Sequence, residues 1–128
     1  MQQNKLDELK QQNEYWKDKL QLIETENIQF KNRLTKLLGN SIPKAQLDQL
    51  EYFFNKFFTL DEQLILLKHE IREQMQAIDK YPAITFDILK LLLVAQEKLE
   101  ARIVIVHRNF GDLNREFSQY IKEKKDVQ

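Results

Sequence analysis

The chain has 128 residues, of which 20 are basic and 20 are acidic, and it contains two glycines, two prolines and no cysteine. So few helix-breaking residues predict an all-α protein, and the lack of cysteine excludes disulfides and zinc–thiolate sites. The balanced charge argues against the basic footprint that binding to nucleic acid requires.

The first predicted element is a helix over residues 6–38 with a heptad pattern. Ten residues follow one another at intervals of three and four without a slip: Leu6, Leu9, Asn13, Trp16, Leu20, Ile23, Asn27, Phe30, Leu34 and Leu37. This spacing predicts a coiled-coil helix, whose narrow apolar seam must pack against another helix. The positions that flank the seam are polar or charged, which favours a helix that protrudes and pairs with a second copy of the chain.

Two asparagines occupy the same class of seam position. With Leu6 at heptad position a, Asn13 and Asn27 also fall at a, where a polar residue favours pairing with its own copy in a parallel homodimer. Trp16 and Phe30 fall at d, where such large rings loosen a two-stranded seam or require a higher-order one. The alternative is that the first helix folds back on its own chain as an antiparallel hairpin within a bundle. The sequence leaves both arrangements open.

A second helical pattern follows a short break. The sequence Gly-Asn-Ser-Ile-Pro at residues 39–43 suits a helix end followed by a new helix start. The apolar positions of the second pattern are Leu47, Leu50, Phe54, Phe57, Leu60, Leu64, Leu67, Ile71, Met75 and Ile78. The regular alternation of three- and four-residue intervals shifts by one residue near Thr59. Thr59 also begins a sequence that resembles a capping box. Residues 44–79 are therefore either one kinked helix, which we favour, or two helices.

An aromatic block lies within the second pattern and contains Phe53, Phe54, Phe57 and Phe58, with Tyr52 beside them. The favoured interpretation is that Phe54 and Phe57 fill the core, while Phe53 and Phe58 cover its flank. The alternative is that part of the block stays exposed and forms a groove for an amphipathic helix of another protein. Any phenylalanine that the bundle cannot bury would mark an interface.

The rest of the chain predicts two further helices. Pro82 ends the second helix, because the residue before a proline is pushed out of helical geometry. A third helix is predicted over residues 84–110, and Gly111 is expected to end it. A short amphipathic fourth helix is predicted over residues 113–121.

The predicted elements form three parts of the chain. Residues 1–38 are the coiled-coil helix, residues 41–121 form a small antiparallel helical bundle, and residues 122–128 are a charged tail.

The most apolar run, residues 88–95, contains Lys90 and is far shorter than the roughly 20 residues of a membrane span. The first residues do not resemble a secretory signal. No membrane contact and a cytoplasmic location are expected.

The sequence offers little chemistry for catalysis or metal binding. His69 and His107 fall on different predicted helices, and only His69 has a carboxylate, Glu73, one turn away. Ser41 and Ser118 have no histidine or aspartate arranged near them in the sequence, and no glycine-rich phosphate loop is present. We therefore expect no enzymatic activity, no cofactor and no metal ion.

These observations support two hypotheses about function. The favoured one is a non-enzymatic scaffold or adaptor that self-associates through residues 1–38 as a parallel homodimer and presents helical modules to an unidentified protein. The alternative is a monomeric helical bundle that acts as a small chaperone or regulator and binds an amphipathic helix of another protein.

Overall fold

The computed structural model consists of three long helices. It describes residues 2–39, 43–80 and 84–127, with side chains described from residue 4 to residue 123 within those ranges. Helix α1 comprises Gln2–Leu38, α2 comprises Lys44–Lys80 and α3 comprises Phe86–Val127. The described residues contain no strand, so the predicted all-α class is confirmed.

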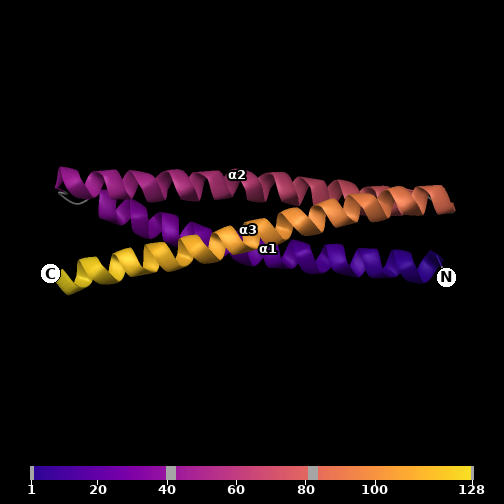
Figure 1. Cartoon of the computed structure of the whole chain (residues 1–128), viewed down its shortest axis with the longest axis horizontal. Helices are drawn as coiled ribbons and strands as arrows, with labels where there is room; N and C mark the ends of the chain where they lie inside the picture. The colour runs from indigo at the N-terminus through magenta and orange to yellow at the C-terminus, as the bar shows by residue number, and fades with distance from the viewer. Residues whose placement is uncertain (1, 40–42, 81–83, 128) are drawn as a thin grey trace.

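The three helices lie side by side along one long axis (Figure 1). Helices α1 and α3 run in the same direction and α2 runs in the opposite direction, so the two termini lie at opposite ends of the molecule. Helix α2 packs closely against both of its neighbours, whereas α1 and α3 approach each other less. The helix in the middle of the chain therefore holds the other two together.

The end of α1, both ends of α2 and the start of α3 agree with the first two predicted breaks, around residues 39–43 and 80–84. Residues 40–42 and 81–83 lie outside the described residues; they include the middle of the predicted break at residues 39–43 and the predicted stop at Pro82. At the end of α1, the Gly39 amide donates a hydrogen bond to the Thr35 carbonyl at 3.1 Å. At the start of α3, the Ile88 amide donates to Thr85 Oγ1 at 3.3 Å, so Thr85 is the N-cap residue.

Helix α2 is a single helix, and Figure 1 shows no sharp bend in it. The prediction of one helix is thus confirmed, whereas the kink predicted within it and the two-helix alternative are wrong. Its buried residues keep an unbroken alternation of three and four: Leu50, Phe53, Phe57, Leu60, Leu64, Leu67, Ile71, Gln74 and Ile78. The drift inferred near Thr59 came from placing Phe54 in the core instead of Phe53. Hydrophobicity does not distinguish two adjacent phenylalanines, but the spacing does.

Helix α3 continues through Gly111, so the predicted separate fourth helix is wrong. Beyond the glycine, Leu113, Phe117 and Tyr120 continue the core spacing of Phe110, and all are buried. Burying each such side chain contributes about 1.5–3 kcal/mol, which exceeds the roughly 1 kcal/mol that a glycine costs inside a helix. Packing therefore overrides the local preference of glycine for a helix end.

Replacing Gly111 with alanine is expected to raise the free energy of unfolding by about 1 kcal/mol, because alanine favours the helix and restricts the unfolded chain. A Cβ atom at this position meets only the Arg115 guanidinium, at 3.9 Å, and the glycine has no positive φ angle. Urea unfolding followed by circular dichroism would show a higher midpoint with an unchanged slope. A lower midpoint would instead indicate that the helix is interrupted at Gly111.

The main hydrophobic core draws on all three helices. Leu20 and Leu34 of α1 pack in one cluster with Phe57 of α2 and Phe117 of α3. The Phe30 ring lies with its centroid 5.9 Å from that of Phe57 and 5.7 Å from that of Phe117. Helix α1 thus shares this core with α2 and α3.

A layer of buried amides divides this core from a smaller apolar cluster. The smaller cluster contains Leu6, Leu9, Ile78, Ile84 and Leu92. Between the two clusters along each helix lies one buried amide residue, namely Asn13 of α1, Gln74 of α2 and Gln96 of α3. Gln96 Oε1 accepts hydrogen bonds from Asn13 Nδ2 and Gln74 Nε2, each at 3.1 Å. We call these three residues the amide layer; it links all three helices at one level.

Candidate functional site

The predicted seam of α1 lies inside the protein's own core. Leu6, Leu9, Asn13, Trp16, Leu20, Ile23, Asn27 and Leu34 are buried, and Phe30 and Leu37 are partly buried against the same core. The seam is covered by α2 and α3 of the same chain, which corrects the prediction that residues 1–38 protrude from the bundle. A narrow stripe indicates how the neighbouring helix packs, but it does not indicate which chain supplies that helix.

The seam asparagines bond to other helices of the same chain instead of to their own copies. Asn13 donates to Gln96 of α3 within the amide layer. Asn27 Nδ2 donates to Asp61 Oδ1 of α2 at 2.6 Å, and Lys31 Nζ lies 2.5 Å from the other oxygen of that carboxylate. These contacts favour one alignment of α1 against its two neighbours.

The structure divides the aromatic block into a core pair and a surface pair. Phe53 and Phe57 are 6% and 1% exposed, whereas Phe54 and Phe58 are 53% and 56% exposed. The prediction that Phe57 fills the core is confirmed, but the expected roles of Phe53 and Phe54 are exchanged. The exposed pair is the part of the predicted groove that remains available to a partner.

Two further apolar residues extend the surface pair along α2. Leu47, Phe54, Phe58 and Ile65 are all exposed. Their intervals of seven, four and seven place them on one side of a helix with 3.6 residues per turn. We call these four residues the α2 stripe; at a rise of 1.5 Å per residue it spans about 27 Å. The predicted apolar pattern of the second helix included Leu47 as a core position and did not include Ile65.

The α2 stripe lies on the side of α2 that borders α1. Asp61 follows Leu47 by two heptads and Phe54 by one, so it lies on nearly the same side of α2 as they do. It pairs with Lys31 of α1 at 2.5 Å. On the opposite edge of α2, Glu70 pairs with Arg102 of α3 at 2.5 Å. A helix bound to the stripe would therefore contact α2 and the adjacent part of α1, and would lie away from α3.

Acidic side chains line the outer edge of the α2 stripe. Asp48, Glu51 and Glu62 are exposed, and none of them forms an ion pair with any residue that the structure describes. Glu51 precedes Phe54 by one helical turn, and Glu62 follows Phe58 by one turn. We call these three carboxylates the acidic rim. One cation, Lys44, lies at the N-terminal end of the stripe.

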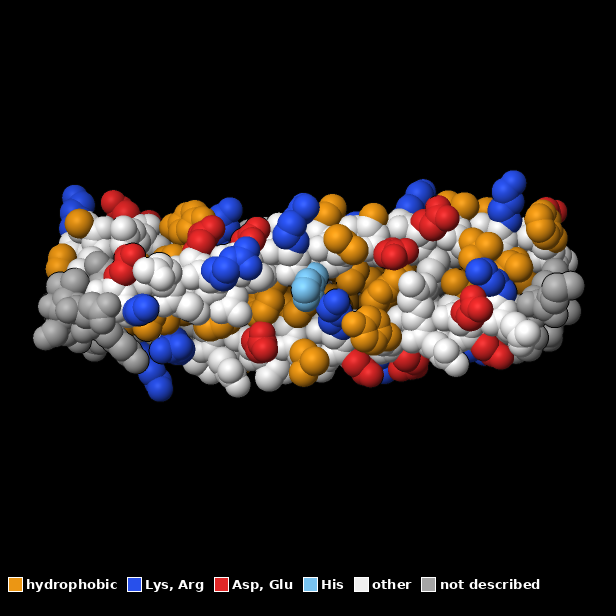
Figure 2. All heavy atoms as spheres, turned by 60° about the horizontal axis from the view of Figure 1, so that its bottom comes forward, with side chains coloured by type: hydrophobic (Ala, Val, Ile, Leu, Met, Phe, Trp, Pro, Cys, Tyr) orange, Lys and Arg blue, Asp and Glu red, His pale blue; other side chains and the backbone are white. Residues whose placement is uncertain are grey.

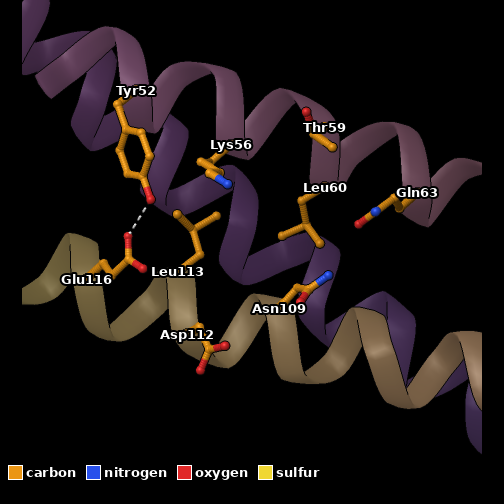
Figure 3. Close-up of a pocket in the computed structure, with 9 residues that line it drawn as sticks. All are labelled: Tyr52, Lys56, Thr59, Leu60, Gln63, Asn109, Asp112, Leu113 and Glu116. Atoms are coloured by element: carbon orange, nitrogen blue, oxygen red, sulfur yellow. Dashed lines mark hydrogen bonds between the residues drawn. The ribbon is translucent and has the colours of Figure 1, made fainter. Parts of the chain in front are cut away.

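A polar groove of about 250 Å³ lies on the other edge of α2, between α2 and α3 (Figure 3). Tyr52 and Glu116 reach toward each other across it, and the Tyr52 hydroxyl donates to Glu116 Oε2 at 2.9 Å. This hydrogen bond, together with desolvation and the negative charge of Glu116, raises the pKa of Tyr52 above its ordinary value of 10.0. The groove offers polar contacts, and its described lining includes no histidine.

The two histidines lie on different helices. His69 Nε2 of α2 is 2.9 Å from Glu73 Oε1, and both side chains are largely exposed. His107 lies on α3 and is also exposed. Within residues 2–39, 43–80 and 84–127, no group of three or more histidine, cysteine, aspartate or glutamate side chains could hold a metal ion.

The molecular surface carries charges of both signs. Figure 2 shows basic and acidic side chains interspersed along one face, with hydrophobic side chains between them. No helix in the described part of the chain is long and apolar enough to cross a membrane.

Comparison of the chain with protein-family models, with curated proteins and with solved structures finds no match to any of them.

Proposed function

We propose that the protein is a non-enzymatic helical bundle that acts as a monomer and binds an amphipathic helix of another protein along the α2 stripe. The observation that carries this proposal is the alignment of four exposed apolar side chains on one side of α2. Exposed apolar side chains that gather on one side of a helix mark a candidate interaction site. An amphipathic helix recognises such a surface through apolar anchors at helical spacing.

The buried seam favours this function over the self-associating scaffold. The scaffold hypothesis required the apolar seam of residues 1–38 to be covered by a second copy, but α2 and α3 of the same chain already cover it. The exposed half of the aromatic block then becomes the best candidate for contact with another molecule. A regulator or a small chaperone that holds one helix of its partner would act through such a face.

A labelled model peptide tests the proposed binding face. The probe is a helical peptide of about 18 residues, long enough to cover the stripe, with leucines on one side and glutamines elsewhere. Fluorescence anisotropy with the full chain is expected to show binding that weakens at least about tenfold in Phe54→Ser/Phe58→Ser, because each anchor contributes more than about 1 kcal/mol. The matched control is Leu22→Ser/Leu91→Ser, which changes two exposed residues on α1 and α3.

Unchanged binding by the stripe variant, or an equal loss in the control, would contradict the proposed face. Light scattering of the wild-type chain supplies an independent check on the monomer. The expected mass is that of one 15.5 kDa chain. A dimer mass that falls to the monomer mass in Phe54→Ser/Phe58→Ser would show that a second copy occupies the stripe.

A further inference from the structure

We infer that the partner helix is basic, an inference that rests on the α2 stripe being the binding site. The acidic rim places Asp48, Glu51 and Glu62 beside the apolar anchors, and no described cation neutralises them through an ion pair. A helix lying on the stripe brings its own flanking residues to the level of this rim. Lysines or arginines at those flanking positions would meet three unpaired carboxylates, whereas acidic residues would be repelled.

The same charges argue against a second copy of this chain as the occupant. A twofold axis that pairs Phe54 with Phe58 of the other copy also pairs Leu47 with Ile65, so the apolar residues match. That arrangement, however, brings Glu51 of each copy to the level of Asp61 and Glu62 of the other. Like charges that face each other across an interface disfavour that pairing. The acidic rim thus selects against self-association and for a partner of opposite charge.

The charge pattern also limits the length of the basic segment. Beyond Ile65 lies a pocket of about 250 Å³ whose charged lining comprises Lys17, Lys68, Arg72 and Asp79, so cations outnumber carboxylates there. Asp79 pairs with Lys10 at 3.1 Å. Lys68 pairs with Glu24 at 2.7 Å, but neither of the other two lining cations pairs with a carboxylate in the described part of the chain. A long basic helix would be repelled there. The partner's basic segment therefore matches the five turns of α2 between Leu47 and Ile65.

Two peptides of opposite charge test this inference. Both have about 18 residues and the same leucine stripe, and they differ only in carrying lysines or glutamates at the flanking positions. Anisotropy titrations with the full chain at low salt are expected to show that the lysine peptide binds at least about tenfold more tightly, with the ratio falling as salt is added. In the rim variant Asp48→Asn/Glu51→Gln/Glu62→Gln the ratio is expected to approach one.

A matched control separates the rim from the overall charge of the protein. Asp87→Asn/Glu97→Gln/Glu100→Gln removes three exposed carboxylates from α3, away from the stripe, and is expected to leave most of the preference for lysine intact. An equal loss in this control would overturn the assignment to the acidic rim.

The two proposals fail in different ways. If both peptides bind equally and Phe54→Ser/Phe58→Ser weakens both, the partner is not selected by charge, although the binding face stands. If the glutamate peptide binds more tightly, the inferred charge of the partner is wrong. If neither peptide binds, or if the phenylalanine variant binds both as the wild type does, the proposed function fails together with this inference.

Discussion

Replacing Phe57 with alanine is expected to lower the free energy of unfolding by about 3–5 kcal/mol, whereas the same change at the adjacent Phe58 should alter it by less than about 0.5 kcal/mol. Phe57 is 1% exposed, and its ring centroid lies 5.9 Å from that of Phe30 and 5.1 Å from that of Phe117. Truncating it leaves a cavity where three helices meet. Phe58 is 56% exposed, so its truncation removes little buried contact.

Urea denaturation followed by circular dichroism measures both changes on the same scale. Phe53 and Phe54 supply a second adjacent pair with one buried and one exposed ring, so alanine at Phe53 is expected to be the more damaging change there. Similar losses of stability at Phe57 and Phe58 would contradict the orientation of α2, in which Phe57 faces the core and Phe58 faces outward. The same measurements serve as a control for the binding experiments, because changes at Phe54 and Phe58 are expected to leave the fold intact.

The amide layer should respond differently to single and combined changes. Replacing Gln96 alone with leucine is expected to lower the free energy of unfolding by about 2 kcal/mol, because Gln96 Oε1 accepts from both Asn13 Nδ2 and Gln74 Nε2. Losing that oxygen leaves two buried amide groups short of an acceptor. Replacing all three amides with leucine removes both the donors and the acceptor, so stability should be unchanged or higher.

The combined variant is expected to lose specificity rather than stability. Buried polar residues reward one alignment of neighbouring helices and penalise others, so an apolar layer should permit alternative registers or higher oligomers. Urea denaturation gives the stability of each variant, and light scattering gives its mass. If replacing Gln96 alone lowered the free energy of unfolding no more than replacing all three amides, the three amides would not act as one hydrogen-bonded layer.

The sequence predicted the all-α class and the extent of α1 and α2, because few helix breakers and sustained apolar spacing leave little choice of secondary structure. It did not predict which chain covers α1. The residues at the seam require a neighbouring helix, and that requirement is met equally by a second copy or by α2 and α3. The large rings of Trp16 and Phe30 were the available signal, since they suit a seam of more than two helices.

The buried amides of α2 and α3 were missed because polar residues are not expected in a core. Gln74 lies three residues after Ile71 and four before Ile78, so continuing the regular spacing would have placed it inside. In the candidate site, Phe54 and Phe58 were named as half of a groove that also contained two core residues. Adjacent phenylalanines do not reveal which side of α2 faces the core. Only the orientation of the helix in the structure shows which pair faces outward.

The position of α2 has a consequence for how a partner would associate. This helix is packed against α1 along one edge and against α3 along the other, so its backbone is restrained on both sides. The apolar anchors on its outer side are therefore preorganised and need no rearrangement to receive a ligand. Most of the loss of conformational entropy on association then falls on the incoming segment, so sequence changes that make that segment more helical when free should tighten the complex.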